Sequence, residues 1–378
     1  MGDSDDFDIS PSMCRSAYCF HEPRFKWGAY DKPDFETIWE LGSEGIREYE
    51  AMRAVPPEFT SAALSDTGNY YFRSDWGRNA NLFHFHCGTI GAGHGHSDQL
   101  HIDLVANGED VLMDGGRYTY VFGDKRCEYK DPTMHNTITV DGQFFTVCKD
   151  SWECSRLSAP VKQQFVTGER YEFVQAGHLG YMPEGVFVNR KIVHIRPDIY
   201  IVTDECYTDG AHAYESYFHF NDRGKVSFAD AKTVCYLGRQ ARAEFYFLSD
   251  GVSLEKKATH LSRRYNHEED NETVTAAWSK EGFSSCMTVI FARNKDDART
   301  FSCEKIPVKS ALKQTVYPDS MAEAVKLRLD GREYVVTICH QEVNSPTDLV
   351  EADGCLGFGM VIVFDKAEDT EAGHVLHW

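Results

Sequence analysis

The sequence predicts a mainly β protein: a large antiparallel β-sandwich with a short N-terminal helical segment and a small C-terminal β appendage. Two observations lead to this prediction. Apolar residues recur at helical spacing over a convincing length only between residues 33 and 55, whereas the chain after Pro57 is dominated by alternating apolar and polar residues. Asn-Gly and Asp-Gly pairs, which favour tight hairpin turns, lie between several of the alternating segments.

The helical segment is PDFETIWELGSEGIREYEAM, which starts at Pro33. Its apolar positions at roughly helical spacing are Phe35, Ile38, Trp39, Ile46 and Tyr49. Asp34 and Glu36 lie in the first turn, where acidic side chains favour a helix start. Gly42 and Gly45 interrupt the pattern, so we expect one broken helix. The first thirty residues show no clear period and are expected to form a mobile lead-in.

Four segments of the following chain have the pattern of two strands joined by a turn. Their turns fall at Asn107-Gly108, Asp141-Gly142, Arg196-Pro197-Asp198 and Asp330-Gly331. A polar stretch at residues 294–310 is the expected seam before the appendage. We therefore divide the chain into a lead-in with a helix at 1–56, a β-sandwich at 57–305 and a small β subdomain at 306–378.

Composition excludes some functions. The 378 residues carry a net charge of −20, which argues against a general nucleic-acid or anionic-membrane surface, and no apolar run is long enough to span a membrane. A polyanion would bind only where Arg and His gather locally. The twelve cysteines lack paired CxxC spacing, so a zinc ribbon is not expected. Reduced cysteines and an acidic N-terminus without a leader favour a cytoplasmic protein.

Candidate chemistry gathers in three segments: GHGHSD at 93–98, LMDGGRYTY at 112–120 and DPTMHNTITVDG at 131–142. In an extended backbone His94 and His96 would point to the same face. Asp114 follows the return strand of the next hairpin, and His135 opens the hairpin after it. Two imidazoles and a carboxylate suit Zn²⁺. From spacing alone, a metal site and a hydrogen-bonded polar turn remain equally open.

Other candidates are weaker. A nucleophilic triad of Ser97, His135 and Asp114 is disfavoured because the chain lacks a GxSxG elbow. His84, His86 and His219 alternate with phenylalanines, as the polar face of a strand does. Four residues near the metal candidates are possible substrate contacts: Arg117, Tyr118, Tyr120 and Arg126.

GHGHSDQLHIDLVANGEDVLMDGGRYTY, followed by MHNTITVDGQ, resembles the carboxy-terminal β-domain of the heparinase II/III-like polysaccharide lyases. These enzymes include heparin, heparan sulfate and alginate lyases, and their β-domain is a super-sandwich. The resemblance covers roughly residues 57 to 300. It implies that His94 faces the active-site cleft as a catalytic neighbour. It also implies that His96, Asp114 and His135 hold a structural zinc ion.

The resemblance implies β-elimination at a uronic acid, with removal of the C5 proton, neutralisation of the carboxylate and protonation of the departing O4. In the family the acid or base Tyr lies in an N-terminal α/α-toroid, of which residues 33–55 resemble only the last helix. We therefore expect an acidic polysaccharide as ligand, substrate contacts from Arg117, Tyr120 and Arg126, and little activity without a separate toroid. A non-catalytic carbohydrate-binding or scaffolding module is the alternative. A cupin-like metal oxygenase is disfavoured because the usual Glu is absent.

Overall fold

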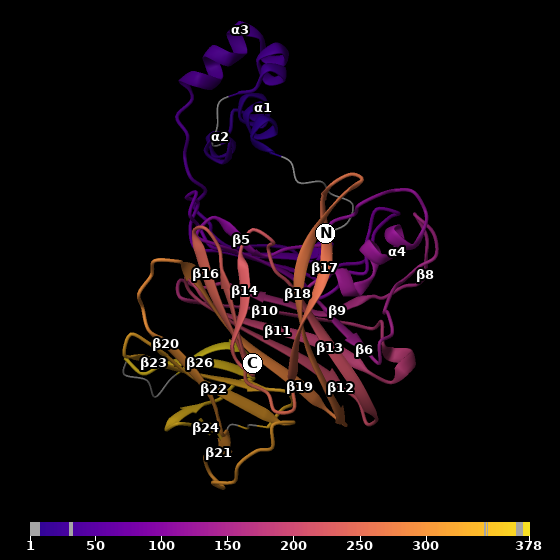
Figure 1. Ribbon diagram of the computed structural model, residues 1–378. Helices are drawn as coiled ribbons and strands as arrows, with labels where there is room; N and C mark the ends of the chain where they lie inside the picture. Colours follow the sequence, from indigo (N-terminus) through magenta and orange to yellow (C-terminus); the bar gives the residue numbers. More distant parts are fainter. Residues whose placement is uncertain (1–7, 30–32, 344, 346, 368–372) are drawn as a thin grey trace. The chain divides into compact units, whose positions relative to one another are not determined.

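The computed structural model describes residues 8–29, 33–343, 345, 347–367 and 373–378 (Figure 1). Its contacts divide the chain into two compact units. One comprises Ser61–Ser74 with Arg78–Trp378, and the other comprises the described residues up to Thr60 with Asp75–Gly77. None of the described helices is long and apolar enough to cross a membrane.

The smaller unit contains three helices: α1 (Ser10–Phe20), α2 (Pro23–Gly28) and α3 (Phe35–Ala51). The broken helix expected at 33–55 is confirmed as α3, which Asp34 caps by accepting a hydrogen bond from the Thr37 amide at 2.8 Å. It kinks at Gly42, where φ is 65° and ψ is −179°. Two helices that the sequence pattern did not predict, α1 and α2, form within the lead-in.

Sequence periodicity missed α1 because the helix buries small side chains rather than a broad apolar stripe. Its buried positions are Ser10, Cys14 and Ala17. Cys14 donates a hydrogen bond from its thiol to the Tyr49 hydroxyl at 3.1 Å, which joins α1 to α3. The unit's core is correspondingly small and consists of Cys14, Ala17, Ala29 and Tyr49.

The larger unit is built from antiparallel sheets, as the fold prediction required. The first sheet is a five-stranded meander of β1 (Ala62–Leu64), β2 (Asn69–Arg73), β3 (Leu82–His86), β4 (His101–Ala106) and β5 (Glu109–Leu112). The central sheet has the order β14 (Lys225–Asp230), β15 (Thr233–Leu237), β16 (Ala241–Phe247), β19 (Ser284–Asn294), β12 (Ile199–Tyr207), β11 (Phe187–Ile195), β10 (Tyr171–His178) and β9 (Pro160–Val166). A further sheet has the order β17 (Ser253–Arg264), β18 (His267–Glu281), β13 (Ala211–His219) and β6 (Ile138–Val140).

The C-terminal part adds two further sheets. One consists of β20 (Phe301–Ile306), β22 (Ala322–Leu329), β23 (Arg332–Cys339), β26 (Val361–Asp365) and β27 (His374–His377). Another consists of β21 (Lys309–Ser310), β24 (Val350–Ala352) and β25 (Cys355–Gly357). A two-stranded hairpin pairs β7 (Val147–Cys148) with β8 (Cys154–Arg156). The short helices of this unit are η1 (Ser65–Thr67), α4 (Asp124–Lys130), η2 (Pro132–Met134) and η3 (Met182–Glu184).

The central sheet is covered on both faces. On one face Tyr200 of β12 stacks on Phe83 of β3, with ring centroids 4.6 Å apart, within a core shared with the first sheet. On the other face Ile201 packs in a second core with Val336 and Val363 of the C-terminal sheet. Double coverage explains why β10 and β12 are buried almost without interruption.

Three of the four expected hairpins are confirmed: β4–β5, β11–β12 and β22–β23. The hairpin expected around Asp141-Gly142 was wrong. Its turn forms, with φ of 51° and 65°, but the two sides share only an isolated bridge between Val140 and Gln143. The reason lies elsewhere in the fold, since β6 pairs with β13 and β7 pairs with β8. The tertiary partner therefore overrides the local turn.

Two buried ionic clusters connect the central sheet to other parts of the larger unit. Arg190 of β11 pairs with Asp204 of β12 through Nε at 2.6 Å, and its Nη1 also donates to the Leu100 and Asn136 carbonyls. His340 lies between two carboxylates, 2.6 Å from Glu205 of β12 and 2.8 Å from Glu323 of β22. The first cluster connects the central sheet to the loops that carry the candidate site.

Candidate functional site

His94 and His96 lie in a turn-rich loop that precedes β4, not in a strand. The side chain of His94 is exposed, whereas His96 is 1% exposed. The same-face expectation was therefore wrong, because it assumed an extended backbone. Gly95 is required between them, since an added Cβ would lie 1.7 Å from the Ile90 carbonyl oxygen. The loop thus presents one imidazole outward and one inward.

Asp114 and His135, two of the predicted metal ligands, lie in direct contact. Asp114 follows β5, and its Oδ1 accepts a hydrogen bond from the Gly116 amide at 2.7 Å. Its Oδ2 accepts from His135 Nδ1 at 2.8 Å. Gly116 has φ +84°, and a Cβ there would lie 2.0 Å from the Ser262 carbonyl oxygen, so glycine is needed for this close approach. Although burial alone raises the pKa of Asp114, the charge and hydrogen bond of His135 lower it below its ordinary value.

His135 is fully buried, and its Nε2 has no hydrogen-bond partner among the described residues. The ring of His96 lies beside it, with centroids 5.4 Å apart. A further imidazole, which the sequence analysis did not select, also lies here. His101, Asp114 and His135 each offer one ligand atom, and these atoms lie within 4.8 Å of one another. The buried donor set of imidazole nitrogens and a carboxylate fits Zn²⁺.

His101 differs from His135 in its hydrogen bonds. Its Nδ1 accepts from the Asn136 amide at 2.9 Å, and its Nε2 donates to Asp103 Oδ1 at 2.9 Å. A neutral imidazole has one donor and one acceptor, so both nitrogens of His101 are used. Asp103 also accepts from His84 at 3.0 Å. This arrangement favours His101 as a neighbour of a metal site rather than a ligand.

The other histidines singled out from the sequence have structural roles. His219 is buried and bonds the Thr133 carbonyl at 2.9 Å and the Thr273 hydroxyl at 2.8 Å. Burial lowers the pKa of His219 to about 3, so the ring stays neutral.

Ser97 is buried in the loop before β4, and its amide donates to the Lys130 carbonyl at 2.9 Å.

Aromatic and cationic side chains surround His94. Its ring meets Tyr120 edge-on at 5.6 Å and Trp152 edge-on at 5.3 Å, and those two rings stack at 5.3 Å. The guanidinium of Arg117 lies 4.6 Å from the Tyr120 ring centroid, and that of Arg126 lies 5.4 Å from it. We name these five residues the His94 cluster. The predicted catalytic residue and the three predicted substrate contacts thus lie together.

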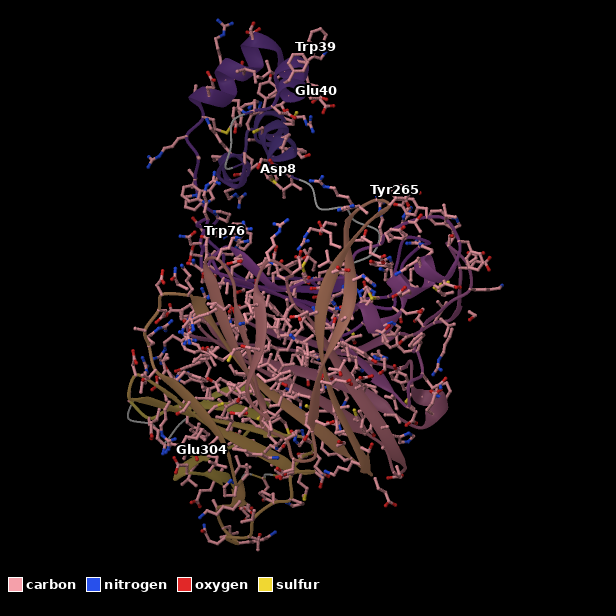
Figure 2. The ribbon with its side chains drawn as sticks, viewed as in Figure 1. Asp8, Trp39, Glu40, Trp76, Tyr265 and Glu304 are labelled. Atoms are coloured by element: carbon pink, nitrogen blue, oxygen red, sulfur yellow. The ribbon has the colours of Figure 1, made fainter. Side chains whose placement is uncertain are left out.

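The members of the His94 cluster differ in accessibility. Trp152 is 50% exposed, whereas Arg126 is fully buried and donates to the Ser151 carbonyl at 3.1 Å. Arg126 therefore packs beneath the cluster. The part of the cluster that solvent can reach consists of its aromatic rings. Tyr265, at the tip of the β17–β18 hairpin (Figure 2), is 42% exposed and lies 5.6 Å from the Tyr120 ring. Trp152 and Tyr265 were not among the predicted contacts, because both lie outside the three segments that hold the candidate residues.

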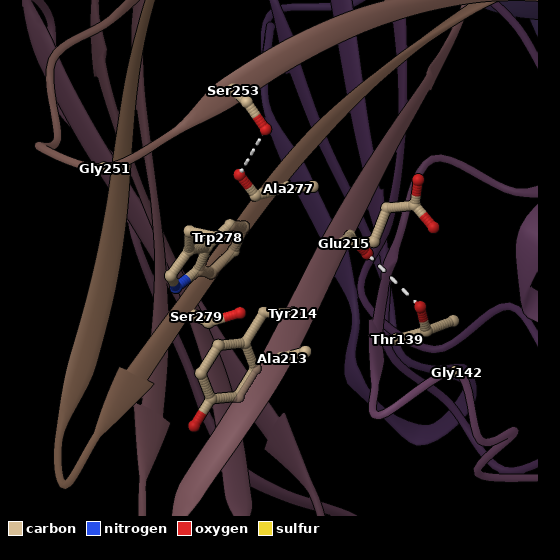
Figure 3. Close-up of a pocket in the computed structure, with 10 residues that line it drawn as sticks. All are labelled: Thr139, Gly142, Ala213, Tyr214, Glu215, Gly251, Ser253, Ala277, Trp278 and Ser279. Atoms are coloured by element: carbon tan, nitrogen blue, oxygen red, sulfur yellow. Dashed lines mark hydrogen bonds between the residues drawn. The ribbon is translucent and has the colours of Figure 1, made fainter.

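A cavity of about 570 Å³ lies on the β13–β18 sheet and shares no residue with the His94 cluster (Figure 3). Its wall includes Trp278 stacked on Tyr214 at 5.3 Å. Trp278 is 6% exposed, so little of its ring is open to a ligand, and its indole N–H already donates to the Ser284 hydroxyl. The one carboxylate in the wall, Glu215, binds Lys257 at 2.6 Å. The cavity therefore offers little chemistry compared with the His94 cluster.

Comparisons with known proteins identify the family and the fold of the chain. The sequence model of the domain described as "Heparinase II/III-like, C-terminal" matches residues 56–303. A heparin-sulfate lyase of Pedobacter heparinus is 32% identical over 112 residues, which cover 28% of this chain and 17% of that enzyme. The heparan sulfate lyase HepC of Pedobacter heparinus superposes with a TM-score of 0.70 at 17% identity, over 91% of this chain and 50% of that one.

A crystal structure of Heparinase III superposes with a TM-score of 0.63 at 14% identity, over 90% of this chain and 50% of that one. The chain thus spans about half the length of these solved structures and a smaller share of the curated relative. At these identities the superpositions establish the fold, and the matched domain covers well over half of the chain. The chain therefore belongs to the heparinase II/III-like family, through the C-terminal domain of that family.

Proposed function

We propose that this chain is the β-domain of a polysaccharide lyase that cleaves a heparan sulfate-like polysaccharide at its uronic acids by β-elimination. The observation that supports the proposal best is the His94 cluster, in which an exposed imidazole lies beside two stacked rings and two guanidinium groups. Sugar rings pack on aromatic faces, and acidic sugars need cations nearby. The cluster provides both on a chain whose net charge is −20.

The reaction sets clear requirements. A base must remove the C5 proton of the uronic acid, a cation or hydrogen-bond donor must neutralise its carboxylate, and an acid must protonate O4. His94 is the exposed titratable group in the cluster and would assist by neutralising charge or transferring a proton. Arg117 donates a hydrogen bond to the Tyr120 hydroxyl, so the cation and the ring are held together beside His94. Arg126 supports them from the buried side.

The proposal includes a helical partner domain, either on the same polypeptide or separate, that completes the active site. Phe35 and Trp39 of α3 support this part. They are 80% and 79% exposed and stack on each other at 6.4 Å, so α3 presents an apolar pair to solvent. A further helical layer would cover such a pair. The family resemblance supports the same partner, since the acid or base tyrosine of these lyases lies in an α/α-toroid.

We further propose a structural zinc ion held by His96, Asp114 and His135. The buried Nε2 of His135 and the adjacent carboxylate support the site. When bound, the metal would supply a cross-link between the loop before β4, the end of β5 and the turn after η2. His94, on the same loop as His96, would thereby be held in place.

One experiment tests the proposed activity. Heparan sulfate oligosaccharides are incubated with the chain alone and with the α/α-toroid of a heparinase III, and the unsaturated product is followed at 232 nm. We expect little product from the chain alone, product from the pair, and none from the pair with His94→Ala. Alginate oligosaccharides form a parallel arm that tests the substrate class.

Calorimetric titration with the same oligosaccharides distinguishes a lyase domain from the alternative, a non-catalytic carbohydrate-binding module. Binding to the chain with no turnover in any pairing would favour a carbohydrate-binding module over a lyase domain. Rapid product formation by the chain alone would contradict the need for a helical partner. The Trp378→Ala variant is the matched control, because Trp378 is 75% exposed and is not part of the His94 cluster.

A further inference from the structure

Two cysteines beside the His94 cluster are almost in bonding contact. The Sγ of Cys127, on α4, lies 3.0 Å from the Sγ of Cys148, on β7, and the Cys127 thiol donates to it. A disulfide needs an S–S distance of about 2.05 Å, so the two sulfurs are about 1 Å from bonding distance. Both side chains are partly exposed, so a small oxidant can reach them.

The two elements that the pair would join already hold the cluster through hydrogen bonds. Arg126 and Lys130 of α4 both donate to the Ser151 carbonyl in the β7–β8 hairpin, at 3.1 and 3.4 Å. Lys130 also donates to the Gly93 carbonyl at 3.0 Å, next to His94. Gly93 faces Trp152 of the hairpin so closely that an added Cβ would lie 3.2 Å from its ring. A covalent cross-link between α4 and the β7–β8 hairpin would therefore restrict the positions of both His94 and Trp152.

We propose that Cys127 and Cys148 form a reversible disulfide. It would link the β7–β8 hairpin to α4 and keep the rings of the His94 cluster in their stacked arrangement. The cross-link is a redox-controlled modification site next to the proposed sugar-binding surface. Its effect on sugar binding rests on the proposed function, whereas the cross-link itself does not.

With a peroxide as oxidant the chemistry balances. One thiolate attacks the O–O bond, which gives a sulfenic acid and hydroxide, and the hydroxide takes a proton to become water. The second thiolate attacks the sulfenic sulfur, so the S–S bond forms, the S–O bond breaks and a second water leaves. Two electrons pass from the two sulfurs to the peroxide. A dithiol reductant reverses the bond by thiol–disulfide exchange.

A third cysteine offers the competing pairing. Cys154 of β8 is the register partner of Cys148 across the hairpin. Cys148 points its thiol elsewhere, toward the Asp150 carbonyl at 3.0 Å, and accepts from Cys127. The geometry therefore selects Cys127 over Cys154 as the partner of Cys148.

Trypsin separates the three cysteines into different peptides. Cleavage after Lys and Arg gives CEYK for Cys127, DPTMHNTITVDGQFFTVCK for Cys148 and DSWECSR for Cys154. The full chain is reduced, treated with one equivalent of hydrogen peroxide, alkylated and digested. We expect mass spectrometry to find CEYK linked to DPTMHNTITVDGQFFTVCK. The link should vanish in Cys127→Ser and Cys148→Ser, persist in Cys154→Ser, and open with dithiothreitol.

The second readout is thermal. The cross-link closes a loop that contains His135, so oxidation should raise the Tm of the chain by roughly 2–4 °C, and by nothing in Cys127→Ser. Oligosaccharide affinity should rise on oxidation in the native chain and stay constant in Cys127→Ser. Recovery of CEYK only in alkylated form, or linked to DSWECSR, would overturn the disulfide. A confirmed link with no sugar binding in either redox state would leave the disulfide standing and count against the proposed function.

Discussion

His135 donates from Nδ1 to the Asp114 carboxylate at 2.8 Å while its Nε2 is buried without a hydrogen-bond partner among the described residues. An unsatisfied buried ring nitrogen costs about 1–3 kcal/mol, and a metal ion at that atom would remove the penalty. The pair is therefore the part of the proposed zinc site with the clearest physical signature.

Asp114→Ala is expected to remove stoichiometric zinc and to lower the free energy of unfolding by about 2–4 kcal/mol, since it removes a ligand and leaves His135 Nδ1 unpaired. Elemental analysis and chemical denaturation measure the two effects. Asp141→Ala is the matched control, because Asp141 binds His212 at 2.7 Å in an exposed pair. Equal zinc content in native, Asp114→Ala and Asp141→Ala proteins would refute the site.

The third ligand is decided by two parallel variants. His96→Ala should lose zinc, whereas His101→Ala should retain most of it and lose stability, because both nitrogens of His101 already have partners. Zinc titration with a chromogenic chelator compares the affinities. Loss of zinc in His101→Ala with retention in His96→Ala would replace His96 by His101 in the ligand set.

Trp152→Ala is expected to weaken heparan sulfate oligosaccharide binding about 5- to 10-fold, because it removes the exposed ring that stacks on Tyr120. Thermal stability should change little, since Trp152 is half exposed. Calorimetric titration measures the affinity, with Trp378→Ala as the control for loss of an exposed tryptophan. An affinity that does not change in Trp152→Ala would mean that sugars bind away from the His94 cluster.

Arg190→Met is expected to destabilise the larger unit by about 3–5 kcal/mol, because it leaves the Asp204 carboxylate buried without its guanidinium. The Asn136 carbonyl loses its 2.8 Å hydrogen bond as well, so zinc affinity should fall with stability. Urea denaturation measures the change. Arg328→Met, at a half-exposed ion pair, should leave the free energy of unfolding nearly unchanged. If Arg190→Met lowered the free energy of unfolding as little as Arg328→Met does, the buried Arg190–Asp204 pair would not have this stabilising role.

The buried Glu205–His340–Glu323 group makes stability depend on pH. Burial alone raises the pKa of each carboxyl, but Lys191 and His340 lower the pKa of Glu205 to about 2, and His340 and Lys305 lower that of Glu323 to about 2. Burial alone lowers the pKa of His340, and the two carboxylates raise it above its ordinary value.

Lowered carboxyl pKa values stabilise the fold above about pH 4.5, and this contribution disappears as the pH falls toward 2. The raised pKa of His340 stabilises the fold below about pH 6.5 and stops doing so as the pH rises through that pKa. Thermal melts should therefore show a Tm drop of roughly 3–6 °C between pH 5 and pH 3. Glu323→Gln should flatten the slope and Asp250→Asn, at a fully exposed carboxyl, should not. An unchanged slope in Glu323→Gln would refute the linkage.

The sequence predicted the parts of the fold that depend on local patterns. Asn107-Gly108 and Asp330-Gly331 adopt positive φ as expected, and the hairpins around them form. The helix α1 could not be predicted this way, because Cys14 and Ala17 are too small to produce an apolar period. The failed hairpin at Asp141-Gly142 has a tertiary cause, since the partner of β6 is 70 residues or more away in the chain.

In the candidate site, Asp114 and His135 lie in contact, and both belong to the ligand set that the family resemblance implied. The opposite exposure of His94 and His96 depends on the backbone turn at Gly95, which alternation rules for strands do not describe. His101 and Trp152 were missed for a different reason. Their positions follow from how β4 and the β7–β8 hairpin pack, and no short motif encodes that packing.

The close packing of the backbone around Gly95, which leaves no space for a side chain, has an evolutionary consequence. With the Ile90 carbonyl oxygen 1.7 Å from where a Cβ would lie, the spacer between the outward and the inward imidazole tolerates neither a side chain nor an easy change of backbone path. Under the proposed function, we expect differences in substrate preference to arise at the tips that bear Trp152 and Tyr265 and the histidine loop to stay unchanged. Sequence comparison among close homologues should find variation concentrated at those tips.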